Sequence, residues 1–254
     1  MSVVSANQSS TRYFYPDEND LLTQILISET GYAQQWSDDE QRVLLDLSRM
    51  VMDIEPPRSI LDVGAGLGRI MSQLEPYFSS GDLVEPDQKR RNELTALVNL
   101  LDPGSRRFSI YASLEEVDQS KKYEFILLSH VLQHISVGEV QGMLTQLAQR
   151  LEEGGLLYIA TCLSPNQQHQ YTVTQFDSNG GFEEVAISEA DFNSLATGPE
   201  ERKLPVHFFP IGALSAMVES AGLAVFQVRP FHPVRDPSSN RTRFRDVAMV
   251  AKYI

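Results

Sequence analysis

The sequence has little cysteine and tryptophan, with one residue of each among 254. The single cysteine, Cys162, excludes an intramolecular disulfide and a zinc site built from cysteines, so we expect a reducing compartment. No apolar run approaches the ~20 residues that a membrane-spanning helix needs, and the N-terminal residues lack the basic and apolar regions of a secretion signal. These absences predict a soluble, cytoplasmic protein with no membrane partner.

Positive charge is also scarce, because 21 Lys and Arg residues face 34 Asp and Glu residues and leave a formal net charge of −13. A protein that binds nucleic acid by neutralising phosphates needs the opposite balance. We therefore expect no nucleic-acid partner, although a local basic patch is compatible with a negative average. A chain of this length can bury a sizeable core without disulfides, which predicts one large domain or one domain with an added lid.

The N-terminal part of the chain precedes the main alternating pattern. Its first residues are polar and rich in serine, which predicts a tail. Two helical patterns follow, over Leu21–Leu26 and Val43–Val51. We assign residues 1–55 to a tail and helical lid, and residues 56–254 to a core.

From Ser59 onward, short apolar runs alternate with helical patterns, which is typical of βαβ units and a parallel sheet. The predicted strands are Ser59–Val63, Gly81–Glu85, Arg107–Tyr111, Tyr123–Ser129, Gly155–Thr161, Ala224–Pro230 and Val247–Tyr253. The predicted helices cover residues 67–76, 88–100, 137–152 and 210–221. The segment between the last two strands is too short and too polar for a crossover helix, so these strands should pair antiparallel. The predicted class is α/β, with a mostly parallel sheet and helices on both faces.

An insertion at about 162–206 separates the fifth predicted strand from the last helix. Within it, Gln170–Phe176 and Phe182–Ile187 flank an Asn-Gly pair at 179–180. Such a pair between two alternating segments predicts a β-hairpin. We expect this insertion to form a lid over the core.

A glycine-rich turn follows the first predicted strand, in the run Asp62-Val63-Gly64-Ala65-Gly66-Leu67-Gly68-Arg69. Glycines let a ligand approach the backbone closely, and the following helix begins with unpaired N–H groups. The dinucleotide fingerprint G-x-G-x-x-G needs a glycine where this chain has Arg69, which disfavours an NAD enzyme. Glu85 follows about twenty positions after Gly64, at the end of the second strand, where a carboxylate can accept hydrogen bonds from ribose hydroxyls. The pattern predicts a nucleotide-type ligand with an unphosphorylated ribose.

The order of these motifs resembles that of class I S-adenosylmethionine-dependent methyltransferases. The resemblance rests on the reversed terminal hairpin and on five motifs, namely the glycine loop from Asp62, Glu85, Ala112-Ser113-Leu114, Leu128–His134 and Leu151–Gly155. It covers about 40–160 and 207–254. It implies S-adenosylmethionine as the cofactor and a Rossmann-like, seven-stranded sheet with the strand order 3-2-1-4-5-7-6.

The resemblance implies roles for residues at two ends of the cofactor. Gly64, Ala65 and Gly66 would line its methionine part. Glu85, followed by Pro86, would hold the ribose.

It also implies roles for residues around the charged and aromatic groups of the cofactor. Asp62 would orient the loop or bind the amino group, and the carbonyl of Ser129 would accept from that group. Arg69 would pair with the carboxylate, a task that the guanidinium geometry favours. Ser113 and Leu114 would meet the adenine, although relatives usually carry an acidic residue at the position of Ser113.

His130 and His134 follow the fourth predicted strand, toward which the donor methyl should point. Methyl transfer is an in-line displacement, so the enzyme aligns the reactants and, for a hydroxyl or protonated amine, accepts a proton. The two histidines are four positions apart and would share one face of a helix, so either is a candidate base. The alternative is that His130 packs against the cofactor and His134 packs the following turn. No carboxylate stands at metal-ligand spacing from them, so we expect no metal.

Aromatic residues on either side of the core sequence are candidates for binding the acceptor. We assign this role to Tyr13, Tyr15, Trp36, His207 and Phe208. Aromatic faces also stabilise a cationic sulfonium or ammonium group, and plain core packing is the alternative.

His232 lies in a local cationic stretch near the C-terminus. The alternation of Arg241, Arg243 and Arg245 predicts a solvated strand face, and the alternative is a docking site for an acidic substrate or carrier.

The leading hypothesis is a methyltransferase that acts on an oxygen or nitrogen of a small molecule. One alternative is a protein or peptide N-methyltransferase, because Gly64–Ile70 is similar to the glycine loop of the protein α-N-terminal methyltransferases. Another is a non-methylating relative that binds the same cofactor, either a regulatory protein or a cyclase-type enzyme. The acceptor and the oligomeric state stay open.

Overall fold

The structure of the protein is a computed structural model that describes residues 42–43, 45–46, 49, 52, 58–104, 106–176, 182–197, 203–235 and 242–254. The predicted tail and first helical pattern lie outside these ranges, together with Tyr13, Tyr15 and Trp36. The described residues of the second helical pattern are helical. Val43 on this helix is buried among residues of the central sheet, and Asp46 forms an ion pair with Arg229. The helix therefore packs on the core.

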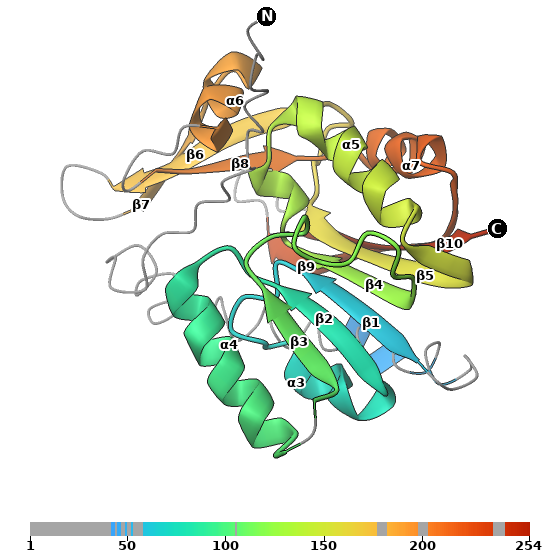
Figure 1. The fold of residues 1–254 in the computed structure, drawn as a ribbon. Coiled ribbons are helices and arrows are strands. Elements are labelled where there is room, and N and C mark those ends of the chain that lie inside the picture. The colour runs from blue at the N-terminus through green and yellow to red at the C-terminus, as the bar shows by residue number, and fades with distance from the viewer. Residues whose placement is uncertain are drawn as a thin grey trace, which may run out of the picture.

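A seven-stranded sheet with the order β3-β2-β1-β4-β5-β10-β9 forms the centre of the fold (Figure 1). Its strands are β1 Ser59–Val63, β2 Ser80–Val84, β3 Phe108–Tyr111, β4 Tyr123–Ser129, β5 Leu151–Cys162, β9 Leu223–Arg235 and β10 Thr242–Tyr253. The first five pair in parallel, and β10 runs antiparallel to both β5 and β9. The predicted class, strand order and reversed terminal hairpin are confirmed.

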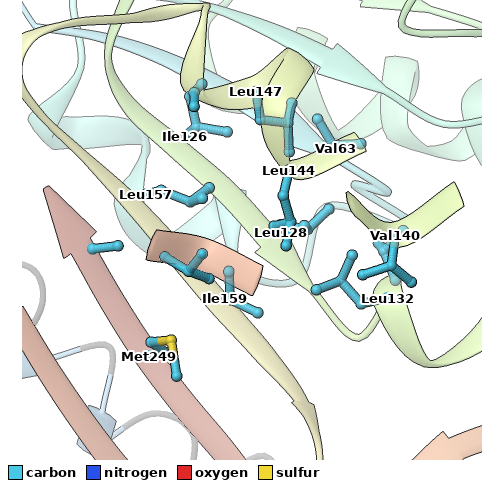
Figure 2. Packing of buried hydrophobic residues seen from close by; sticks show 14 of the residues in the cluster. Val63, Ile126, Leu128, Leu132, Val140, Leu144, Leu147, Leu157, Ile159 and Met249 are labelled. Carbon is cyan, nitrogen blue, oxygen red and sulfur yellow. The ribbon is translucent and has the colours of Figure 1, made fainter. Parts of the chain in front are cut away.

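Apolar residues fill both faces of the central strands because helices cover both faces. On one face, α5 (Val137–Ala148) and α7 (Ile211–Ser220) pack on β4, β5 and β10. Figure 2 shows this cluster, in which Leu144 and Leu147 of α5 lie over Ile126 and Leu128 of β4. On the other face lie α3 (Met71–Leu74) and α4 (Gln88–Leu101). None of the helices within the described ranges has the length and apolar character to cross a membrane.

Two predicted helices have different bounds in the structure. The segment predicted as helix 67–76 contains only α3, followed by the 3-10 helix η1 (Glu75–Tyr77), because Gly66 and Gly68 adopt positive φ and Pro76 enters the next turn. The helix predicted over 137–152 ends at Ala148, and β5 begins at Leu151. A bulge separates the pairs Tyr123–Leu151 and Phe125–Leu156, and Gly154 lies within it at a φ of 77°. The sequence pattern missed this early start because the bulge interrupts the alternation.

The insertion after β5 folds as a second sheet with the order β7-β6-β8, which we call the lid sheet. Its strands are β6 (Gln170–Phe176), β7 (Phe182–Ala186) and β8 (Lys203–Phe208), and α6 (Glu189–Thr197) covers one face. The structure agrees with the predicted hairpin, whose Asn-Gly turn lies outside the described residues. The sequence pattern predicted neither α6 nor β8.

Gly68 packs the turn after β1 against α4 with a φ of 79°. A Cβ at this position would lie 2.6 Å from Leu97 Cδ2 and 2.8 Å from Leu94 Cδ1. We expect Gly68→Ala to lower the free energy of unfolding by about 2 kcal/mol or more, because it adds both a strained φ and a steric contact. Urea denaturation measures the change.

Gly212→Ala is the matched control, because a Cβ at Gly212 in α7 meets open space. This substitution should stabilise the protein by roughly 1 kcal/mol or less through helix propensity. Equal effects of the two substitutions would contradict the packing role of Gly68.

Candidate functional site

The glycine loop after β1 is held against the ends of two neighbouring strands. The N–H groups of Gly64 and Ala65 donate to the Val84 carbonyl at 2.9 and 3.0 Å. Gly64 has a φ of 77°, and a Cβ there would lie 2.4 Å from Cγ2 of Val131 in the loop after β4. Only glycine therefore lets the ends of β1, β2 and β4 meet as they do.

Glu85 connects the glycine loop to the end of β2. Its side chain is buried, with 1% of the residue exposed. Its Oε2 accepts from the Gly66 N–H and its Oε1 from the Asp87 N–H, each at 2.9 Å. Burial raises the pKa of Glu85, and these two N–H groups partly offset that rise. Each carboxylate oxygen can accept a second hydrogen bond, so the group can still receive ligand hydroxyls.

Asp62 places a second buried acid next to Glu85. Burial is the main cause that raises its pKa to about 7, the charge of Glu85 raises it further, and the guanidinium of Arg69 lowers it. A carboxyl group in this state ionises readily when a cation binds beside it. The predicted residues Asp62, Arg69 and Glu85 thus share one electrostatic environment.

A cavity of about 370 Å³ opens beside the glycine loop, which we call the first cavity. The predicted residues Gly64, Pro86, Ser113 and Leu114 line it. The other lining residues are mainly apolar and come from β1, β2, α5 and the loops after β3 and β4: Val63, Val84, Ala112, Glu115, Val131, Ile135, Gly138, Glu139, Gly142, Met143 and Gln146. A volume of this size with apolar walls suits a flat organic ligand.

Glu115 and Glu139 supply acidic groups to the first cavity that sequence reasoning missed. The sequence contained a signal for Glu115. The family resemblance leads one to expect an acidic residue at the position of Ser113, and Glu115 is an acidic residue two positions further along. Glu139 had no such signal, since only the packing of α5 brings it to the cavity.

His130 begins the loop after β4, directly beyond Ser129. It adopts a φ of 57°, and its N–H donates to the Ala160 carbonyl at 2.7 Å. Its ring stands edge-on to that of Phe231, with 6.3 Å between the centroids. The structure does not place His130 and His134 on one helical face, because only the 3-10 helix η2 (Leu132–His134) forms here.

His134 is held by two hydrogen bonds within the protein. Its Nδ1 lies 2.8 Å from the Pro205 carbonyl and therefore donates to it, so its Nε2 accepts from the Gln133 amide at 3.2 Å. Burial lowers the pKa of His134 to about 4, which leaves it neutral at pH 7. Gln133 also reaches His130, whose Nδ1 lies 3.3 Å from its Oε1. His134 thus connects the core to β8.

The structure contains a buried histidine–aspartate pair that sequence reasoning missed. Nδ1 of His232 lies 2.9 Å from Oδ2 of Asp246, and both side chains are 3% exposed. His232 has a φ of 59° and follows Phe231, whose ring contacts His130. The neighbouring arginines suggested a solvated stretch, and only the pairing of β9 with β10 reveals the buried contact.

His207 and Phe208 point to opposite faces of β8. His207 is buried between Tyr171 and Phe209, with centroid distances of 4.6 and 3.8 Å, and its Nε2 lies 2.7 Å from Nδ1 of His169. Burial lowers the pKa of His207 to about 3. Phe208 lines a second cavity, so the structure brings Phe208 but not His207 to a cavity.

The described residues contain no group of three or more His, Cys, Asp or Glu side chains that could hold a metal ion.

Comparison with known proteins places the chain among methyltransferases in sequence pattern and fold. A family model described as a methyltransferase domain matches residues 35–228. No curated protein matches the sequence.

Three solved structures illustrate the likeness in fold. The 1,6-didemethyltoxoflavin-N1-methyltransferase of Burkholderia thailandensis, with 1,6-didemethyltoxoflavin and S-adenosylhomocysteine bound, is 14% identical, with a TM-score of 0.60 over 92% of this chain and 85% of that chain. The Synechocystis magnesium protoporphyrin IX methyltransferase with S-adenosylmethionine bound is 12% identical with a TM-score of 0.61 over 95% and 94%. An S-adenosylmethionine-dependent methyltransferase from Clostridium acetobutylicum is 12% identical with a TM-score of 0.58 over 91% and 96%.

Folding raises the pKa of Asp62 from 3.8 to about 7. Between these two pH values the carboxyl group keeps its proton in the folded protein but has released it in the unfolded chain. Asp62 therefore contributes stability below about pH 4 that is lost as the pH rises toward 7. We expect Asp62→Asn to remove this loss, so the free energy of unfolding of the variant relative to wild type should rise by about 1 to 3 kcal/mol between pH 4.5 and 7. Urea denaturation at several pH values measures it.

Folding also lowers the pKa of His134, and the contribution of this residue to the free energy of unfolding therefore rises with pH, opposite to that of Asp62. That effect is present in both proteins and cancels in their difference. A difference that does not change with pH would contradict the assigned state of Asp62.

Proposed function

The chain belongs to the methyltransferase domain family, and we propose that it transfers the methyl group of S-adenosylmethionine to an oxygen or nitrogen of a small molecule. The family model covers most of the chain, and the sheet has the strand order expected of such an enzyme. The observation that carries the proposal is the glycine loop closed onto the buried carboxylate of Glu85 beside the first cavity.

The residues at this edge of the sheet fit the cofactor group by group. The carboxylate of Glu85 has acceptor capacity left for the two ribose hydroxyls. The cationic amino group has Asp62 as a partner, whose raised pKa allows it to ionise on binding. Leu114 and Val131 offer apolar surface to the adenine. When bound, S-adenosylmethionine supplies an electrophilic methyl group on a positively charged sulfur.

Four further residues complete the proposed cofactor site. Ala65 and Gly66 are the residues proposed for the methionine part, and their membership of the loop that bonds to Val84 and Glu85 supports this assignment. Ser129 is the last residue of β4, next to this loop, and its carbonyl is the acceptor proposed for the amino group of the cofactor. Arg69 is the partner proposed for the cofactor carboxylate, and its charge already acts on Asp62.

The proposed proton acceptor is His130. It directly precedes Val131, which lies against Gly64. Its ring contacts Gln133 and Phe231, at the edge of the sheet where we propose that the methyl is delivered. His134 was the other candidate, and its bonds to Pro205 and Gln133 together with a pKa of about 4 support a positioning role instead. For the acceptor itself, Tyr13, Tyr15 and Trp36 remain predictions outside the described residues.

Cofactor binding tests the site. We expect Glu85→Ala to weaken S-adenosylmethionine binding at least about tenfold, because it removes the ribose acceptor and also releases the Gly66 N–H. Isothermal titration calorimetry measures the affinity. Glu93→Gln on the exposed surface of α4 is the matched control and should bind normally. Unchanged affinity in Glu85→Ala would rule out the assigned ribose site.

The destination of a labelled methyl group tests the class of acceptor. The protein is incubated with methyl-tritiated S-adenosylmethionine and a cell extract separated by size into small-molecule and macromolecular fractions. We expect label in the small-molecule fraction, with equimolar S-adenosylhomocysteine. Label in protein would favour a peptide N-methyltransferase, and binding without any S-adenosylhomocysteine would favour a non-methylating relative.

A further inference from the structure

A second cavity of about 630 Å³ lies between the lid sheet and the ends of β9 and β10. The face of the lid sheet that borders it carries Gln170, Thr172 and Phe208, as the strand register requires. On the same face Val206 and Phe208 pack against Cys162 at the end of β5. The cavity therefore sits over the carboxyl end of β5, at the same edge of the central sheet as the glycine loop.

Strand pairing links this cavity to His130. Arg245 lines the cavity, and its carbonyl accepts from the Leu163 N–H at 2.7 Å. The next residue, Asp246, lies opposite Cys162 on one side and Phe231 on the other, and the ring of Phe231 contacts His130. Backbone pairing thus connects the wall of the cavity to Phe231 and His130, although neither of these two residues lines it.

Among the described residues that line the second cavity, the charges are mainly positive. Arg243 and Arg245 line it together with a single carboxylate, Glu184. Arg245 lies 3.5 Å from Glu184, and both side chains are about one-third exposed, which makes this ion pair weak. Two arginines at one cavity are a local excess of positive charge in a chain with a net charge of −13.

His169, Gln170, Tyr171 and Thr172 add polar groups to the second cavity, and its other walls are apolar. Leu163, Pro165, Ile187, Phe208 and Phe244 contribute them. Phe244 is 42% exposed, so part of its ring is accessible to a ligand. The hydroxyl oxygen of Thr172 is buried and has no hydrogen-bond partner within the described part of the chain.

We propose that the second cavity binds the methyl acceptor and that this acceptor is a small anion, with a carboxylate or a similar group on an apolar ring. The anionic group pairs with Arg243 and Arg245, and the ring lies against Phe208 and Phe244. This assignment rests on the proposed function, since it identifies the cavity as the acceptor pocket. A cationic acceptor is disfavoured, because it would bring a third positive charge to the two arginines.

Because the natural acceptor is unidentified, we choose 2-naphthoate as the probe and 2-naphthamide as its uncharged counterpart. Their affinities are measured by fluorescence titration in the presence of S-adenosylhomocysteine. We expect the acid to bind at least about tenfold more tightly than the amide, and its advantage to shrink with added salt. Equal binding of the two probes, or tighter binding of 2-naphthylmethylamine, overturns the proposal.

Charge variants locate the binding. Arg243→Gln and Arg245→Gln should each weaken naphthoate binding about fivefold or more, with the amide unaffected. Glu184→Gln should strengthen it, because this change removes the carboxylate that competes for Arg245. Arg106→Gln, an exposed arginine before β3 at the opposite edge of the sheet, is the matched control and should change nothing. Naphthoate affinity that is the same in the three cavity variants and in wild type overturns the site.

Cofactor titrations of the same variants separate this proposal from the proposed function. All four variants should bind S-adenosylmethionine as wild type does, because none belongs to the glycine loop or the first cavity. Failure of wild type to bind S-adenosylmethionine would overturn the proposed function and, with it, the role of the cavity as acceptor pocket. Normal cofactor binding with no preference for the anionic probe would overturn the anionic acceptor alone.

Discussion

The close approach of Gly64 to Val131 is the constraint on which the site depends. A Cβ at Gly64 would lie 2.4 Å from a methyl carbon of Val131, which is too close, so the two loops can meet only around a glycine. Their contact joins the ends of β1 and β4, and the bonds from Gly64 and Ala65 to Val84 add the end of β2. His130 precedes Val131, and Glu85 follows Val84 directly, so these contacts together position the proposed ribose acceptor and the proposed base.

Electrostatics divide the carboxyl edge of the sheet into two regions. Asp62 and Glu85 place two acids in a buried environment that raises the pKa of both, which favours a cationic ligand beside them. Arg243 and Arg245 gather at the other region, under the lid sheet. A cationic donor and an anionic acceptor would therefore each meet a region of opposite charge, and this separation orients two reactants toward one another.

The lid sheet forms a wall of the second cavity, and its contacts with the core include three polar ones. His134 donates to the Pro205 carbonyl, Leu163 forms a bridge with Phe209, and Arg245 pairs with Glu184. The first two involve buried groups, whereas the ion pair is exposed to solvent and contributes little to stability. The lid is thus fixed along β8 and held more weakly at β7.

Periodicity and spacing within the sequence determined the α/β class, the strands of the core, the reversed hairpin and the hairpin of the insertion, because these features depend on neighbouring residues. The motif order added the strand order and the cofactor. The glycine loop and Glu85 could also be predicted from the sequence, since a loop between a buried strand and a helix has few structural solutions.

Other features of the two cavities were decided by the tertiary structure alone. The register of β9 with β10 and of β6 with β8 decides three features. These are the pairing of His232 with Asp246, the turn of Arg243 and Arg245 toward a cavity, and which of His207 and Phe208 lies on the face that borders this cavity. A shift of one residue in such a register reverses every side chain, and no local pattern specifies it.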